Sequence, residues 1–152
     1  MLAAIRPDSW NFPLLVHILG SMVLVGAVFA AVSALFAGWR RDPATYTRFA
    51  FWTLLVVAFP AWWVMRLGAQ WIYSTEHFSG DNDPTWVDIG RITAEPGLLL
   101  LLLAIVVTGI GTRRLRAADD GPSTLSRVGA VLSVVLLAAY VVAVWAMSAK
   151  PD

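Results

Sequence analysis

The sequence contains no cysteine among its 152 residues. This absence excludes disulfides, thiol redox chemistry, metal sites built from thiolates and haem that is attached covalently to the chain. Histidine is scarce as well, since there are only two, and one of them, His17, lies in an otherwise apolar stretch. Any metal or redox chemistry must therefore rely on few and scattered ligands.

Charge is the second scarcity. Charged residues make up 14% of the chain, whereas soluble proteins average about 25%. Asp, Glu, Lys and Arg are absent from four long runs, residues 9–39, 49–65, 96–112 and 128–149. A hydrocarbon core about 30 Å thick needs about 20 helical residues to cross it. Because the runs offer no polar face to water, they indicate membrane-spanning helices rather than a soluble bundle.

We expect a single all-α domain over residues 1–152, an integral membrane four-helix bundle. The expected helices cover about 12–38, 49–71, 96–112 and 127–149. The connection 72–95 is long enough to hold structure of its own. A short helix near 84–93 is expected within it, because Asp83 and Pro84 suit the N-cap and the first helical position.

Proline and run length set further boundaries. Pro60 removes a backbone donor from the second helix and should interrupt or kink it near the Val56 carbonyl. The third helix should open at Glu95-Pro96-Gly97. The first run is longer than the 7–15 apolar residues, roughly, of a cleavable signal sequence. We therefore expect it to be retained as a helix.

The arginines predict the orientation. The connections after the first and third helices hold seven basic residues: Arg40, Arg41, Arg48, Arg113, Arg114, Arg116 and Arg127. Positive residues collect on the cytoplasmic side of a membrane. Both termini and the connection 72–95 should therefore lie outside, in a multi-pass protein of a bacterial inner (cytoplasmic) membrane. The net charge of +1 gives no indication of nucleic-acid binding.

Small residues recur at a spacing of four in the first helix and also pair in the last. Residues at this spacing let helix backbones approach closely in a membrane. We expect them to form a packing seam, either within the chain or between chains. The residues are Gly26, Ala30, Ala34 and Gly38 in the first helix and Gly129 and Ser133 in the last.

Polar and aromatic side chains gather at one depth, in the expected outer half. An ionisable residue inside a span indicates function, because its burial is costly unless it is paired. His17 and Arg66 are such residues and predict an outer-leaflet ligand pocket. Arg66 could instead pair with Glu95 or Glu76, and His17 could hydrogen-bond a backbone carbonyl or a hydroxyl. The remaining residues expected near this pocket are Ser21, Trp62, Trp63, Tyr140 and Trp145.

Several cofactors are compatible with these side chains. Haem b needs two axial ligands, which His17 could share with Met65 or Met147, or with His77 folded inward or supplied by a second chain. The same thioethers could hold Cu(I). A quinone would need a donor to its carbonyl and aromatic walls. Methionine is also an ordinary core filler, so packing alone accounts for its presence.

The stretch LLVHILGSMVLVGAVFAA, residues 14–31, is similar to the first helix of uncharacterised bacterial four-helix membrane proteins. Their pattern L-H-x-L-G-x-x-x-x-x-G is matched here at His17, Gly20 and Gly26. More distantly it resembles helices of membrane proteins of the copper-resistance D type. The first resemblance implies a four-helix bundle. The second implies that His17 is a metal ligand.

The sequence favours a non-enzymatic membrane protein. It carries neither a Ser-His-Asp order nor an H-E-x-x-H motif. We expect the protein to self-associate or to serve as an accessory subunit of a larger membrane complex. One alternative is a redox-linked protein that binds haem b, quinone or copper through His17. A further alternative is a transporter of a small anion that uses Arg66.

Overall fold

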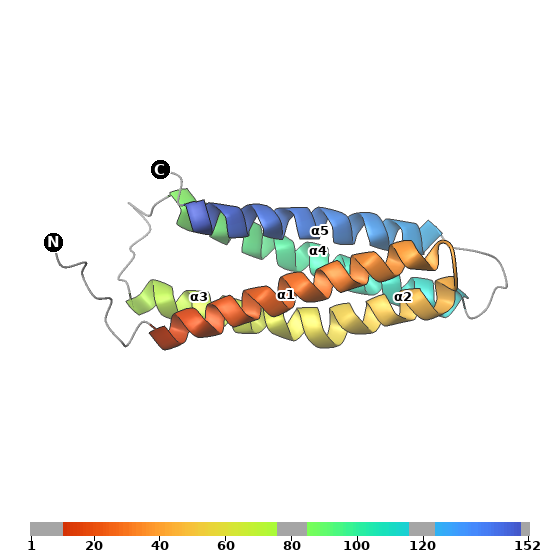
Figure 1. Ribbon diagram of the computed structural model, residues 1–152, viewed down its shortest axis with the longest axis horizontal. Coiled ribbons are helices and arrows are strands. Elements are labelled where there is room, and N and C mark those ends of the chain that lie inside the picture. Colours follow the sequence, from red (N-terminus) through yellow and green to blue (C-terminus); the bar gives the residue numbers. More distant parts are fainter. Residues whose placement is uncertain (1–10, 76–84, 116–123, 150–152) are drawn as a thin grey trace.

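The computed structural model describes residues 11–75, 85–115 and 124–149, and these residues form an up-and-down arrangement of helices (Figure 1). The first span is α1 (Asn11–Gly38), the third is α4 (Thr85–Leu115) and the fourth is α5 (Thr124–Ala149). The second consists of α2 (Pro43–Trp52), the π-helical segment η2 (Thr53–Ala58) and α3 (Phe59–Thr75). In the described part of the chain, four helices are long and apolar enough to cross a membrane. The expected all-α architecture, with four helices that could each span a membrane, is confirmed.

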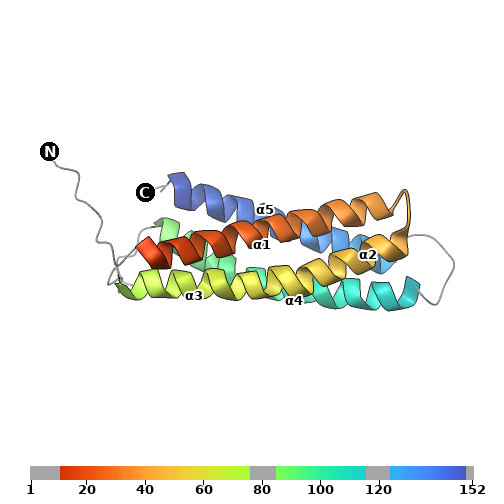
Figure 2. The same cartoon turned by 60° about the horizontal axis from the view of Figure 1, so that its bottom comes forward.

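The spans pack in chain order. α1 packs along α2 and α3, and α2 also contacts α4. α4 packs along α5, and α5 in turn packs against α1 (Figures 1 and 2). α3 and α4, by contrast, meet at few points. α1 begins and α5 ends at the same end of the bundle. The opposite end, called here the arginine end, holds Arg40, Arg41, Arg48, Arg113, Arg114 and Arg127.

The second span starts at Pro43, so the start expected near residue 49 is wrong. Asp42 is the N-cap, and its side chain accepts hydrogen bonds of 3.1 Å from the backbone N–H groups of Ala44 and Thr45. Pro43 at the first turn loses no intrahelical bond there. Arg48 consequently lies inside α2 and not in the connection. The Asp-Pro pair is the sequence signal that would have placed this boundary.

Pro60 lies within a span that remains helical on both sides of it. The expected interruption takes the form of η2, where the Phe59 N–H donates to the Leu54 carbonyl, five residues back. A proline ring clashes with the carbonyl four residues before it. The wider π turn ahead of Pro60 relieves this clash without ending the helix.

The third span also begins earlier than expected. α4 runs without a break from Thr85 through Pro96, so a third helix opening at Pro96 and a separate surface helix over 84–93 are both wrong. A proline inside a helix costs one backbone hydrogen bond, which membrane helices tolerate. Asp88 in the first turn suits the positive end of the helix dipole. The expected cap at Asp83 and Pro84 lies outside the described residues.

The α1 small residues do not form one seam inside the chain. Gly26 is exposed, Ala30 is half-buried, and Ala34 and Gly38 are buried. A spacing of four advances about 40° around a helix at each step, because one turn holds about 3.6 residues. The row therefore winds from the outer surface at Gly26 to the core at Gly38. Both α5 residues expected in the seam, Gly129 and Ser133, are buried.

Candidate functional site

The helices α1 and α3 cross with their backbones in contact. A Cβ added at Gly20 would lie 2.5 Å from the Met65 nitrogen, and one added at Gly68 would lie 2.7 Å from the His17 nitrogen. Real Cβ atoms do not come this close to backbone atoms, and a backbone cannot move aside as a side-chain end can. The crossing therefore requires glycine on both helices, and it brings His17 beside α3.

His17 bonds across this crossing. Its ring Nδ1 lies 3.0 Å from the Met65 carbonyl oxygen. Because a carbonyl only accepts, Nδ1 is the protonated nitrogen in this contact, and in the neutral ring Nε2 then carries the lone pair. Of the partners considered for His17, the backbone carbonyl is the one observed. The Ser21 hydroxyl donates instead to the His17 carbonyl within α1, at 2.8 Å.

Arg66 forms an ion pair with Glu95 of α4, with 3.7 Å between Nη2 and Oε1. The side chains are 27% and 67% exposed. Pairs this open to the surroundings contribute little stability, about 0–1 kcal/mol in water. Glu76, the other partner considered, lies outside the described residues. An anion bound by Arg66 would have to compete with the Glu95 carboxylate.

Trp62 provides a second link between α3 and α4. Its indole Nε1–H donates to the Ala94 carbonyl at 3.1 Å, and its side chain is buried. Trp63 packs edge-to-face on Trp62, with 5.0 Å between ring centroids, but is itself exposed. Trp62 and the Arg66 ion pair thus join two helices that otherwise meet at few points.

Tyr140 of α5 packs against α4 at Gly97. A Cβ at Gly97 would lie 3.0 Å from the Tyr140 Cε1 and 3.1 Å from its hydroxyl oxygen. Tyr140 is buried, and its hydroxyl has no hydrogen-bond partner within the described residues. The Met147 methyl lies beside Gly90, while Trp145 is exposed and points away from the core.

These contacts define an outer polar layer, which consists of His17, Trp62, Arg66, Glu95 and Tyr140. The sequence placed four of them at one depth, and the structure joins them pairwise to neighbouring helices, α1 to α3, α3 to α4 and α5 to α4. The described residues contain no group of three His, Asp or Glu side chains that could hold a metal ion. His77 lies outside the described residues.

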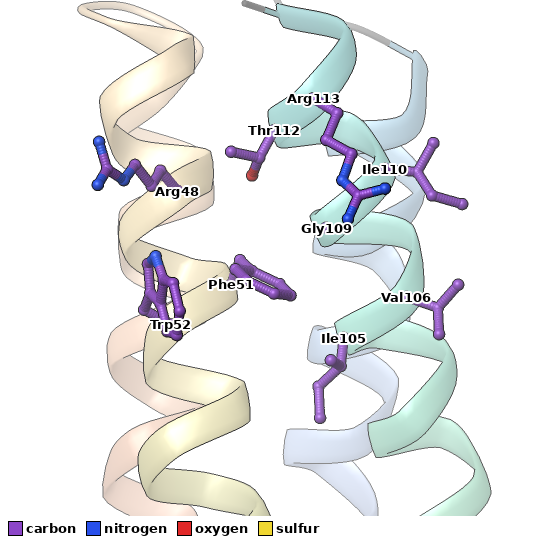
Figure 3. A pocket seen from close by; sticks show the side chains of 9 residues that line it. All are labelled: Arg48, Phe51, Trp52, Ile105, Val106, Gly109, Ile110, Thr112 and Arg113. Carbon is purple, nitrogen blue, oxygen red and sulfur yellow. The ribbon is translucent and has the colours of Figure 1, made fainter.

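A cavity of about 530 Å³ lies between α2 and α4 near the arginine end (Figure 3). Sequence reasoning did not find it, because Arg48 was assigned to a connection. The sequence signal for it was a pair of arginines in successive spans. Arg48 directly precedes the apolar run 49–65, and Arg113 directly follows the run 96–112. The walls include Arg48, Phe51 and Trp52 from α2 and Ile105, Gly109 and Arg113 from α4.

Comparisons with protein-family models, curated proteins and solved structures give no match for this chain. The similarity of residues 14–31 to other first helices therefore stays a prediction.

Proposed function

We propose that the protein is a non-catalytic integral membrane protein that acts by association. Its partner is a second copy of the chain or a larger membrane complex of which it is an accessory subunit. We also propose that the arginine end faces the cytoplasm of a bacterial inner membrane, supported by the positive-inside rule. The groups of the outer polar layer support a non-catalytic role, since His17, Trp62 and Arg66 are each engaged with a neighbouring helix.

The observation that carries the proposal is a row of exposed residues on α1, called here the α1 stripe. Its residues, Met22, Gly26, Phe29, Ser33 and Phe36, are all exposed. They alternate spacings of four and three, which is the spacing that packs one helix along another at about 20°. Apart from its two chain neighbours and the backbone of its own helix, no atom of the described chain lies within 4 Å of the position that a Cβ of Gly26 would take.

The α1 stripe has the shape that helix association needs in a membrane. Small residues allow close approach, and larger neighbours fill the gaps on the facing helix. Gly26 and Ser33 are the small positions, and Met22, Phe29 and Phe36 are the large ones. A second α1 helix could place a large side chain over Gly26, and the Ser33 hydroxyl could hydrogen-bond across the pair.

The test compares Gly26→Leu with Ala138→Leu, which enlarges an exposed position on α5 away from the α1 stripe. Oligomeric state is measured by single-molecule photobleaching in lipid vesicles, and partners are captured by crosslinking in native membranes. We expect Gly26→Leu to reduce association and Ala138→Leu to leave it unchanged. A wild-type chain that is monomeric and crosslinks to no other membrane protein would refute the proposal.

A redox-linked function remains the second candidate because of one observation. A histidine that ligates a metal almost always donates its other ring N–H to a carbonyl or carboxylate. His17 has this arrangement, since Nδ1 bonds the Met65 carbonyl and leaves the Nε2 lone pair for haem iron, copper or a polarised quinone. Tyr140, buried with a hydroxyl that no other described residue hydrogen-bonds, is a further polar group in the same layer.

This candidate is tested by absorption spectra of the purified protein, first oxidised and then reduced with dithionite. A Soret band that shifts on reduction and disappears in His17→Ala would establish haem. Bound copper or quinone, measured by elemental analysis and extraction, should be lost in the same variant. If no cofactor copurifies, His17→Ala should cost only the interhelical hydrogen bond, about 0.6–2 kcal/mol of unfolding free energy.

A further inference from the structure

The cavity between α2 and α4 opens on the outer surface of the bundle and runs away from the arginine end. On the α4 wall it extends from Arg113 to Ile105, which at about 1.5 Å per residue is a depth of about 12 Å. On the α2 wall, Arg48 and Trp52 follow one another by one turn (Figure 3). The cavity is therefore cationic at its mouth and apolar along its length.

The inner boundary of the cavity is set by an aromatic ring. Phe51 projects from α2 toward α4 in Figure 3. Its Cε2 atom would lie 2.9 Å from a Cβ at Gly109, so the ring rests directly on the α4 backbone. This contact closes the space toward the core and leaves it open toward the surroundings. A long, thin, apolar molecule could lie over Phe51 between the two helices.

Two arginines line opposite walls at the mouth, and in Figure 3 the Arg48 guanidinium extends away from α4, so this exposed side chain would turn toward Arg113 to share a ligand with it. Arg48 and Arg113 are both exposed, and neither pairs with a carboxylate of the described residues. Asp42 is the one carboxylate that the described chain places at this end, and it is engaged as the α2 N-cap. The Thr112 hydroxyl, which also lines the cavity, donates to the Thr108 carbonyl. Within the described residues, the mouth therefore offers guanidinium groups that no carboxylate compensates.

We propose that this groove binds one anionic phospholipid from the leaflet at the arginine end. The phosphate of the headgroup lies between Arg48 and Arg113, and one acyl chain lies along Phe51, Ile105 and Val106. A guanidinium group binds phosphate in a bidentate manner, with two parallel N–H···O hydrogen bonds. Basic pockets between membrane helices are suited to anionic headgroups. The volume of about 530 Å³ falls in the range of about 300–1,000 Å³ that is usual for bound small molecules.

The occupant is a lipid rather than a free phosphate because of the apolar length below the arginines. A phosphate ion would use only the mouth and would leave Phe51, Ile105 and Val106 without a ligand. A zwitterionic lipid would fill the apolar part, but its choline or ethanolamine group would bring a cation close to two arginines. Charge and shape together therefore select an anionic headgroup on an acyl chain.

The test is native mass spectrometry of the purified protein in mild detergent, titrated with dioleoyl phosphatidylglycerol or dioleoyl phosphatidylcholine. We expect one phosphatidylglycerol to bind in preference to phosphatidylcholine. Arg48→Gln and Arg113→Gln should each weaken this binding about fivefold, which is the usual contribution of one arginine near an anionic lipid. Arg114→Gln is the matched control, an exposed neighbour outside the groove, and should leave the affinity unchanged.

A second variant tests the apolar part without altering charge. Val106 is exposed and lines the groove, so Val106→Trp should fill the acyl-chain path and weaken phosphatidylglycerol binding by a similar factor. Circular dichroism checks that each variant remains helical. Equal binding of the two lipids, or unchanged affinity in the double variant of Arg48 and Arg113, would overturn the proposal. Inorganic phosphate that competes as strongly as the lipid would show an ion site instead.

Discussion

At the scale of single residues, the length of a polar side chain decides whether it hydrogen-bonds within its own helix or to a neighbouring one. The hydroxyls of Thr93, Thr108 and Thr112 bond carbonyls of their own helix, at 2.6 to 2.9 Å. The longer side chains of His17 and Trp62 reach carbonyls on another helix. These three threonine hydroxyls thus bond within their own helix, whereas the imidazole and the indole fix one helix against another.

Asp42 is a residue whose contribution depends on pH. The Thr45 side chain and the N–H groups of Thr45 and Ala44 hydrogen-bond its carboxylate and hold its pKa below the ordinary value of 3.8. Because the folded-state pKa is the lower one, the contribution to stability is complete above the ordinary value. It is lost as the pH falls through the folded-state pKa. We expect Asp42→Ala to have a lower unfolding midpoint than the wild type at neutral pH. In acid, the midpoints of the two proteins should become similar.

Asp42→Asn is the control for this prediction. Asparagine is an equally good N-cap that does not titrate. Its advantage over Asp42→Ala should therefore stay constant with pH, whereas the advantage of the wild type should shrink in acid. Unfolding followed by circular dichroism from neutral to acidic pH measures both differences. A wild-type advantage that persists unchanged in acid would contradict the role assigned to the carboxylate.

At the scale of helices, the close α1–α3 crossing depends on Gly20 and Gly68. We expect Gly20→Ala to lower the free energy of unfolding by about 1–3 kcal/mol, because the added methyl group meets the Met65 backbone. The matched variant is Gly26→Ala, which adds the same methyl group on the same helix where the described chain leaves open space. In the monomeric protein, it should cause no loss of unfolding free energy.

Unfolding of the two glycine variants is measured by titration with sodium dodecyl sulfate and circular dichroism. NMR spectra provide a second readout, because the chemical shifts of the His17 ring depend on its hydrogen bond to the Met65 carbonyl. If Gly20→Ala separates α1 from α3, these shifts should change in that variant and not in Gly26→Ala. Equal stability of the two variants would show that the crossing relaxes without cost.

The sequence predicted the helices through their uncharged cores, but it placed the starts of the second and third spans too late. Apolar runs report the part of a helix that lies in the hydrocarbon region, and α2 and α4 continue beyond it through polar residues. Arg48 is charged and the stretch 85–95 carries Asp88, Arg91 and Glu95, yet these residues are helical. Pro96 was interpreted as a start, because proline is frequent at the first turn, although one missing hydrogen bond did not end the helix.

At the scale of the whole molecule, the two ends of the bundle differ in charge. Asp88 and Glu95 lie near the end where α4 begins, and the arginine end holds six arginines in the described residues. The absence of cysteine makes the orientation directly measurable. We expect Ala149→Cys to react with a membrane-impermeant maleimide in intact cells, and Thr124→Cys to react only after the membrane is opened.

Both positions are exposed and lie at opposite ends of α5. Each therefore serves as the control for the other, because they share one helix and differ only in the side of the membrane. Labelling of Thr124→Cys alone in intact cells would reverse the proposed orientation.

The candidate sites show how far a single sequence reaches. Depth follows from distance along a helix, so His17, Arg66 and Tyr140 were placed in one layer. Their partners depend on helix order and rotation, which no local pattern states. The Met65 and Ala94 carbonyls are backbone groups and carry no sequence signal at all. The groove at Arg48 and Arg113 required the true start of α2, and it was missed for that reason.

The π-helical turn η2 gives the second span a spare residue. Before it, Thr47 and Ala50 are buried, within it Leu54 and Ala58 are buried, and after it Ala61 and Gly68 are buried. The bulge absorbs the surplus locally, so both halves keep the same side toward the core. Loss of one exposed residue, Val56 or Val57, together with Pro60→Ala would restore a regular helix without rotating either half. The span is thus tolerant of a change in length at this one place.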